Sequence, residues 1–203
     1  MNIPETNLKR IIVIGGGFGG LQMIRNIPPN SYQIVLFDKH NYHTFQPLLY
    51  QVATAGLEPD SVAYPLRKIF KNRPEFYFRL AEVKSIDADK KRVVTDIGKL
   101  EYDYLVLATG STTNFFGNPA FEYLSMGMKN VPEALNIRSL LLQNFEKALL
   151  TNDLEERESL MNIVIVGAGR MGFSLAQDLD REGHEVSVID MRPEAAELAQ
   201  TRL

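Results

Sequence analysis

The most constraining feature of the sequence is a glycine pattern that occurs twice. Gly15 to Gly20 and Gly167 to Gly172 both fit the spacing G-x-G-x-x-G. Each copy follows a β-branched run, which predicts a buried parallel strand, and each is followed by a helical pattern and a second apolar strand. The expected strand, helix and strand lie at 11–14, 18–26 and 33–37 around the first copy and at 163–166, 170–182 and 185–189 around the second.

An aspartate ends the second strand of each repeat, Asp38 in the first and Asp190 in the second. Glycines at this spacing make a tight turn, let the backbone approach a pyrophosphate and let the helix pack on the strand, while the helix N-terminus stabilises the phosphate charge. The aspartate accepts hydrogen bonds from a ribose. The repeats therefore predict an α/β, Rossmann-like chain with two dinucleotide sites. The alternative interpretation is that the glycines only make tight turns and hold no ligand.

Composition excludes several other classes of function. The chain has 22 Lys plus Arg against 25 Asp plus Glu, a net charge of -3, and therefore no basic footprint for nucleic acid. Its apolar runs are far shorter than the roughly 20 residues of a membrane helix, and no signal-peptide pattern opens it, so we expect a cytoplasmic chain whose membrane contact is peripheral. With 0 Cys and 3 His, we expect no disulfide, redox cysteine pair or metal site.

Between the glycine repeats, the pattern predicts both β-rich and helical segments. We expect a short helix at 61–70, strands of a meander at 76–87 and 91–95, a buried strand at 104–108 and a helix at 132–150. Two parallel strands after residue 161 expose apolar faces, so we expect the second unit to dock on the first domain, to pair with a second copy of the chain or to be loosely ordered.

Residues 9–161 resemble the type II NADH:quinone oxidoreductases, which are flavoproteins with two dinucleotide-binding domains. The resemblance is carried by Asn41 to Gly56 and by Leu105 to Ser111. It implies an FAD-dependent oxidoreductase that takes a hydride from NADH and passes two electrons to a quinone at the inner face of a membrane. It also implies an FAD-binding domain at 1–112, a connecting segment and helix at 113–160, and a truncated NAD(H)-binding βαβ unit at 161–203. The absence of cysteine separates the chain from the disulfide reductases and sulfide-oxidising flavoproteins.

The same resemblance assigns residues to the two nucleotides but assigns no catalytic side chain, because the flavin carries the chemistry. For FAD it implies a pyrophosphate loop of Gly15, Gly17, Phe18, Gly19 and Gly20, and a ribose-binding acid, Asp38, with its neighbour Lys39. The backbone of Val83 would contact the adenine. The strand end at Ala108, Thr109 and Gly110 would lie beside the cofactor, and Pro47 and Gln51 would lie nearer the flavin. For NAD(H) they are Gly167, Gly169, Arg170, Met171, Gly172 and Asp190.

The tail at 162–203 departs from the flavoprotein pattern and resembles the nucleotide-binding regulatory domains of potassium uptake systems. Those domains bind NAD, NADH or adenine nucleotides without chemistry. An alternative function is therefore a non-catalytic nucleotide-binding module fused to a flavoprotein-like scaffold. Asp190 favours NAD over NADP because its charge repels a 2′-phosphate, whereas the nearby Arg192 opposes that preference.

Overall fold

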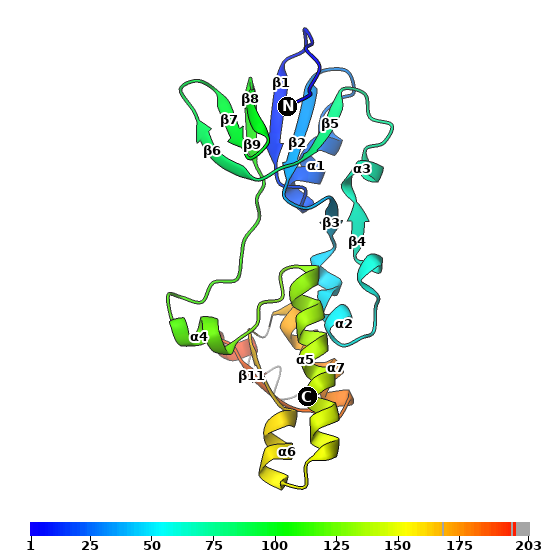
Figure 1. The fold of residues 1–203 in the computed structure, drawn as a ribbon, viewed down its shortest axis with the longest axis vertical. Helices are drawn as coiled ribbons and strands as arrows, with labels where there is room; N and C mark the ends of the chain where they lie inside the picture. The colour runs from blue at the N-terminus through cyan, green and yellow to red at the C-terminus, as the bar shows by residue number, and fades with distance from the viewer. Residues whose placement is uncertain (168, 196, 198–203) are drawn as a thin grey trace. The chain divides into compact units, whose positions relative to one another are not determined.

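The computed structural model describes residues 1–167, 169–195 and 197. The chain forms two compact units, each built from two stretches of sequence (Figure 1). Unit 1 consists of Met1–Thr44 and Ala63–Thr112, and unit 2 consists of Phe45–Val62 and Thr113–Leu203. The sequence analysis placed 45–62 inside a continuous first domain, whereas the structure groups this segment with the second unit.

Unit 1 is built on a four-stranded parallel sheet with the order β5-β2-β1-β9. One face carries a helix and the other a three-stranded antiparallel meander, so the unit is a layered α/β fold as expected (Figure 1). The bounds of the sheet strands are Phe76–Leu80 for β5, Gln33–Asp38 for β2, Arg10–Ile14 for β1 and Tyr104–Leu107 for β9. The covering elements are helix α1 (Phe18–Asn26) and strands β6 (Val83–Asp87), β7 (Arg92–Thr95) and β8 (Gly98–Glu101).

Strand β1 is buried on both faces because its side chains alternate between the two layers. Ile11 and Val13 pack against Leu21 of α1. Ile12 and Ile14 belong to a second cluster, on the meander side of the sheet. Burying one such side chain fully is worth about 1.5–3 kcal/mol, so the continuous β-branched run fixes the central position of this strand.

The segment between the glycine loop and the meander differs from the expected pattern. The helix expected at 61–70 is replaced by a 3-10 turn η2 (Pro59–Ser61), strand β4 (Ala63–Pro65), which pairs with β3 (Tyr42–Thr44), and a short helix α3 (Leu66–Ile69). Pro65 explains the change, because a proline disfavours helical backbone at the residue before it. The strand expected at 76–87 is also divided, since β5 joins the parallel sheet and β6 the meander.

Strand β9 was expected to be buried, and this expectation is wrong for its two ends. Tyr104 is 47% exposed and Leu107 is 64% exposed. The strand lies at the edge of the sheet and pairs only with β1 among the described strands, so it has a neighbour on one side alone.

Unit 2 combines helices with a two-stranded parallel sheet. Helix α2 contacts both α5 and α7, and α5 contacts α6. The bounds are η1 (Gln46–Leu48), α2 (Leu49–Ala53), α4 (Pro119–Leu124), α5 (Val131–Leu150), α6 (Leu154–Met161), β10 (Asn162–Val166), α7 (Arg170–Arg181) and β11 (Glu185–Ile189). Helix α5 confirms the helix expected at 132–150, and its start is fixed by the Asn130 side chain, which accepts a hydrogen bond from the Glu133 amide at 2.9 Å. None of the helices in the described ranges combines the length and apolar character that a membrane crossing requires.

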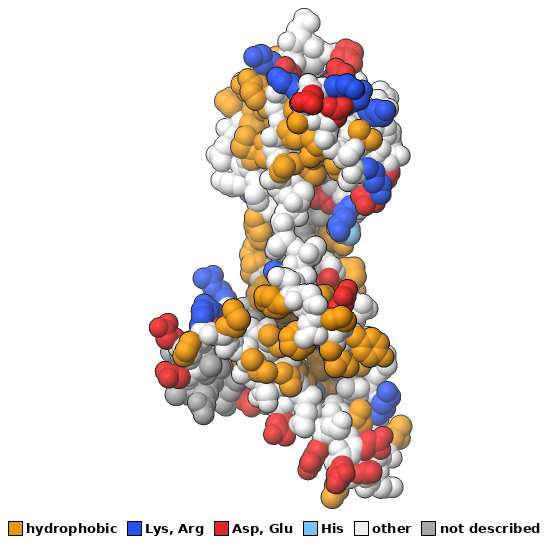
Figure 2. All heavy atoms as spheres, turned by 90° about the vertical axis from the view of Figure 1, so that its left-hand side faces the viewer, with side chains coloured by type: hydrophobic (Ala, Val, Ile, Leu, Met, Phe, Trp, Pro, Cys, Tyr) orange, Lys and Arg blue, Asp and Glu red, His pale blue; other side chains and the backbone are white. Residues whose placement is uncertain are grey.

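Among the described residues, the sheet of unit 2 is covered on one face and largely exposed on the other. On the covered face Ile165 packs with Leu175, Ala176 and Leu179 of α7. On the other face Val164, Val166 and Ile189 are 61%, 77% and 56% exposed. Their equivalents in the first repeat, Ile12, Ile14 and Phe37, are 0%, 7% and 0% exposed. Figure 2 shows one side of the molecule, on which exposed hydrophobic side chains gather in both units.

We predict that equivalent truncations in the two repeats have unequal costs. Ile12→Ala should lower the free energy of unfolding of unit 1 by about 3 kcal/mol because it leaves a cavity between two packed layers. Val164→Ala should lower that of unit 2 by less than about 1 kcal/mol because the side chain is largely in solvent. Hydrogen exchange of peptides from each unit measures the two values separately. Equal losses of unfolding free energy in the two variants would contradict the exposure of the bare face, which is formed by Val164, Val166 and Ile189.

Candidate functional site

The first glycine loop leaves β1 through a turn that only glycine fits. Gly15 has a φ of +105°, and its amide donates to the Phe37 carbonyl at 2.8 Å. A Cβ added at Gly15 would overlap the Ala108 carbonyl, and one added at Gly20 would overlap the Gly15 carbonyl. The ends of β1, β2 and β9 therefore meet around this turn, with the start of α1 packed directly against it.

The N-terminus of α1 faces open space at the centre of this loop. Gly17 is the N-cap residue and has no side-chain hydrogen bond, and a Cβ built on it would have no described atom within 4 Å. The Leu21 amide makes a helical bond back to the Gly17 carbonyl at 3.0 Å. An uncapped helix start next to free volume is suited to an anionic group, because the helix dipole and the first amides favour negative charge there.

Asp38, at the end of β2, holds the loop through two backbone hydrogen bonds. Its Oδ2 accepts from the Gly16 amide at 2.5 Å, and its Oδ1 accepts from the His40 amide at 2.8 Å. A carboxylate has about four acceptor positions, so capacity remains for hydroxyl groups of a ligand. Asp38 is therefore both a structural anchor of the loop and a candidate ribose acceptor.

Two residues of this site were missed by sequence reasoning, Gly16 and His43. A Cβ at Gly16 would lie 2.7 Å from Leu66 Cδ1 and 3.2 Å from Asp38 Oδ2, so a side chain here would force these two neighbours to shift. The Nδ1 atom of His43 lies 3.0 Å from the Gly16 carbonyl oxygen, and its ring meets the Phe18 ring edge-on at a centroid distance of 4.9 Å. The signal that the sequence offered for Gly16 was a glycine at a position where the G-x-G-x-x-G pattern accepts any residue.

The other residues expected at FAD divide between the two units. Ala108 follows β9 directly, its amide donates to the Ile14 carbonyl at 2.8 Å, and Gly15 and Gly19 lie beside it. The loop, Asp38 and Ala108 are thus brought together within unit 1. Unit 1 also contains Val83, which begins β6, and three exposed residues, Lys39, Thr109 and Gly110. Unit 2 contains Pro47, which is exposed in η1, and Gln51, which is half-buried in α2.

The second glycine loop repeats the geometry of the first. Gly167 has a φ of +108°, and its amide donates to the Ile189 carbonyl at 2.6 Å. A Cβ at Gly172 would overlap the Gly167 carbonyl, and the Phe173 amide bonds to the Gly169 carbonyl at 2.9 Å. Arg170 is exposed and Met171 half-buried, both in the first turn of α7. One difference is that a Cβ at Gly167 would have no described atom within 4 Å, since nothing in the described part of unit 2 takes the place of Ala108.

Asp190 follows β11 and forms an ion pair with Arg192. The Arg192 Nε atom lies 3.1 Å from Asp190 Oδ1, and the Arg192 amide donates to the same oxygen at 2.8 Å. The hydrogen bond that the Arg192 guanidinium donates to Asp190, together with the carboxylate charge, raises the pKa of Arg192 above its usual value. The Arg192 cation thus lies against Asp190, the acid expected to repel a 2′-phosphate. The repulsion is partly offset, so the predicted preference for NAD over NADP is weaker.

The described part of the chain contains no group of three or more His, Cys, Asp or Glu side chains arranged to hold a metal ion. His40 and His43 instead lie beside rings of the same unit. The His40 ring is 5.3 Å from the Tyr42 ring, and the His43 ring contacts Phe18.

The sequence profile of the pyridine nucleotide-disulphide oxidoreductase family matches residues 9–203. The match runs through the tail at 162–203, which the sequence analysis compared with potassium uptake systems. These comparisons give that second resemblance no support.

Relatives of this chain include NADH:quinone and NAD(P)H-ubiquinone oxidoreductases. The type II NADH:quinone oxidoreductase NdhA of Mycobacterium tuberculosis is 36% identical in an alignment of 171 positions that covers 82% of this chain and 36% of that protein. The external alternative NAD(P)H-ubiquinone oxidoreductase B3 of Arabidopsis thaliana is 33% identical over 98% of this chain and 36% of that protein. This chain therefore spans about a third of the length of these relatives.

A solved structure shares the fold. The structure of NDH2 from Plasmodium falciparum in complex with NADH matches with a TM-score of 0.79 and 25% sequence identity. The match covers 90% of this chain and 41% of that one.

We predict that alanine is tolerated at one loop glycine and not at another. Gly15→Ala should destabilise unit 1 by at least about 2 kcal/mol, because the new Cβ enters a strained backbone region and overlaps the Ala108 carbonyl. Gly17→Ala, the matched control, should change the free energy of unfolding by less than about 1 kcal/mol because its Cβ enters open space. Urea unfolding followed by circular dichroism measures both, and a Gly15→Ala variant of unchanged stability would refute the described turn.

Proposed function

The chain belongs to the pyridine nucleotide-disulphide oxidoreductase family, and on this basis we propose that it is the nucleotide-binding part of an FAD-dependent NADH:quinone oxidoreductase. The observation that carries the proposal is the glycine loop of unit 1, where an open helix N-terminus, a carboxylate and the end of a third strand lie together. The names of the relatives supply the reaction class. The 203 residues contain 0 Cys, so electrons do not leave through a disulfide of this chain.

The residues of the first loop fit the chemistry of FAD. We propose that the backbone from Gly15 to Gly20 and the start of α1 hold the pyrophosphate, where the open space at Gly17 leaves room for its oxygens. Asp38 accepts from the ribose while it keeps its bond to the Gly16 amide, and the Val83 backbone binds adenine. The bound flavin would supply the chemistry by accepting a hydride and releasing electrons, whereas the protein binds and orients it.

The second loop is assigned to NADH for the same physical reasons. Its turn, its uncapped helix start and Asp190 repeat the arrangement of the first loop, so a second dinucleotide is the ligand that this geometry suits. Arg170 and Met171, at the start of α7, border that position. We propose an FAD-binding domain at 1–112, whose segment 45–62 is grouped with unit 2, a connecting segment at 113–160 and an NAD(H)-binding unit at 161–203.

A quinone is the proposed electron acceptor, and Pro47 and Gln51 are the residues proposed to lie nearer the flavin. We propose a cytoplasmic protein that is peripheral to the inner face of the membrane; the contact with the membrane follows from the proposed acceptor, because a quinone is dissolved in the lipid. A second copy of the chain is the proposed cover for the bare face formed by Val164, Val166 and Ile189.

The first test is a visible spectrum of the purified chain after incubation with FAD and desalting. We expect retained flavin absorption that falls when NADH is added without oxygen. Asp38→Ala should weaken FAD binding at least about tenfold, because a ligand hydrogen bond to a charged group is lost. Titration with flavin fluorescence measures the affinity.

The matched control is Asp89→Ala, which removes an exposed carboxylate from the turn between β6 and β7 and should leave FAD affinity unchanged. Circular dichroism checks that both variants are folded. A colourless protein after desalting, or equal FAD affinity in the Asp38→Ala variant and the wild type, would count against the proposed site.

The ion pair at the second loop predicts a shift in coenzyme preference. Asp190→Ala should weaken NADH binding and strengthen NADPH binding relative to it, because Arg192 loses its partner and becomes a donor to a 2′-phosphate. The companion variant Arg192→Ala should disfavour NADPH, since the negative charge of Asp190 is then no longer offset by the Arg192 guanidinium. Equilibrium binding of each nucleotide to the three proteins measures the ratio, and an unchanged ratio in both variants would exclude this role.

A further inference from the structure

A basic pocket lies in unit 1, at the end of α1 opposite the glycine loop. Its volume is about 390 Å³, and its lining includes Arg25, Lys68, Lys71 and Arg73. Pockets of about 300–1,000 Å³ accommodate small molecules. Arg25 lies in the last turn of α1, whereas the glycine loop begins that helix. A helix of 9 residues separates the two ends by about 13 Å, so the pocket is distinct from the proposed FAD site.

The charge in this pocket is not balanced by the protein. No Asp or Glu lines it, and across residues 1–167, 169–195 and 197 no carboxylate lies within ion-pair distance of these four side chains. The chain as a whole has a net charge of -3, so the pocket is a local departure from the overall balance. Like charges held together repel one another, and an anion bound between them removes that repulsion.

Helix capping accounts for only half of the charge. Arg25 complements the negative end of α1, and Arg73 does the same through its Nη2 atom, which donates to the Ile27 carbonyl at 2.5 Å. Lys68 lies on α3, a helix of 4 residues with little dipole of its own, and Lys71 lies beyond it. Helix capping therefore does not account for the two lysines.

Arg73 also retains unused donor capacity. Its Nε atom is buried and has no hydrogen-bond partner among the described atoms. A buried donor without a partner costs about 1–3 kcal/mol. An anionic oxygen is the kind of partner that a guanidinium group binds best.

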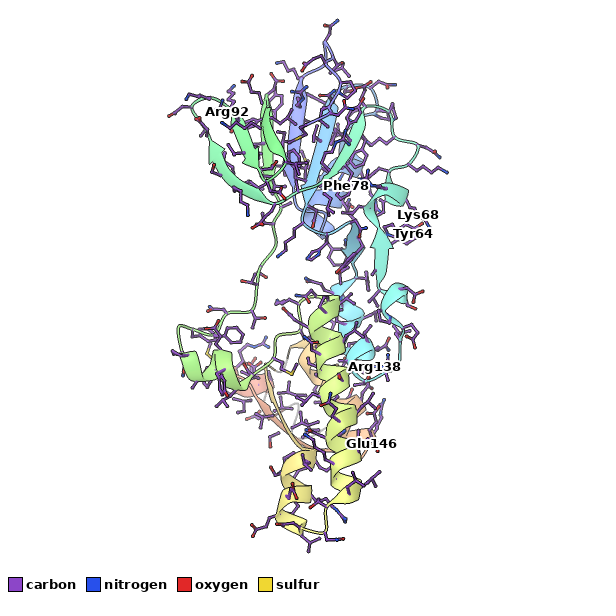
Figure 3. The ribbon with its side chains drawn as sticks, in the orientation of Figure 1. Tyr64, Lys68, Phe78, Arg92, Arg138 and Glu146 are labelled. Carbon is purple, nitrogen blue, oxygen red and sulfur yellow. The ribbon has the colours of Figure 1, made fainter. Side chains whose placement is uncertain are left out.

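The pocket has an apolar floor in addition to its cations. Phe70 is 8% exposed and belongs to the core under α1, and Ile69 packs against the same core. Lys68 is exposed on α3, from which Figure 3 shows it extending. An apolar floor with exposed lysines at its rim suits a phosphate attached to an apolar group.

We propose that this pocket binds the phosphate group of a ligand, either an anionic phospholipid headgroup or a soluble phosphate compound. The two sources share the same recognition chemistry, in which Lys68, Lys71 and Arg73 surround the phosphate oxygens. The proposal is independent of the redox function, because it uses no residue assigned to FAD, NADH or quinone.

The test compares the full chain with two double variants of equal charge. Lys68→Gln with Lys71→Gln removes two pocket cations. Lys84→Gln with Lys90→Gln removes two cations that already pair with Glu82 and Asp87, at 2.7 Å and 3.8 Å. One arm titrates inorganic phosphate by calorimetry at low salt. The other measures sedimentation with vesicles of phosphatidylcholine alone or mixed equally with phosphatidylglycerol.

We expect the pocket variant to lose at least about tenfold in affinity in one or both arms, and the control variant to match the wild type. Loss of sedimentation with the mixed vesicles identifies a lipid headgroup, and an effect on inorganic phosphate alone identifies a soluble compound. The proposal is overturned if the wild type binds neither probe, or if the two double variants behave alike. Circular dichroism confirms that each variant is folded, and all four substituted lysines are exposed.

Discussion

Three strand ends and one helix start converge on the backbone of Gly15. Its amide bonds to the end of β2, its Cα faces the carbonyl at the end of β9, and its own carbonyl lies against Gly20 at the start of α1. No side chain fits between these groups, so the spacing of the layers is set by backbone alone. The rest of unit 1 depends on this contact, because the register of β1 with both neighbours places their ends at the same edge.

The internal repeat separates what a local sequence determines from what its surroundings determine. The two loops agree in turn geometry, in backbone hydrogen bonds and in the position of the helix start. They differ in burial, since Ile12 is fully buried whereas Val164 is largely exposed. A βαβ unit therefore folds the same way in both places, but its burial depends on a third strand and a second layer that come from elsewhere.

Features encoded locally were predicted well. Helix α1, helix α5 and both glycine loops were expected from residues adjacent in the sequence. Three features were not predicted: the division of the strand expected at 76–87, the strand β4 within the helix expected at 61–70, and the exposure of the two ends of β9. Strand pairing and the edges of a sheet depend on partners that are distant in the sequence.

The candidate site follows the same rule. The fingerprint predicted the glycines and Asp38, which the structure brings together, but it gave no indication of His43, whose contact with Gly16 joins residues far apart in the sequence. The grouping of 45–62 with unit 2 was equally hidden, since the sequence is continuous there. The basic pocket brings Arg25 together with Lys68 and Lys71, which lie far from it in the sequence, so no local sequence motif indicates the pocket.

The bond between the Asp38 carboxylate and the Gly16 amide bears on the energetics of ligand binding. It closes the glycine loop on the protein's own atoms, and His43 lies against the carbonyl of the same residue. The loop is thus preorganised, and the pyrophosphate that we propose as its ligand would meet a turn already formed. Because little backbone entropy remains to be lost on binding, more of the interaction energy is expressed as affinity.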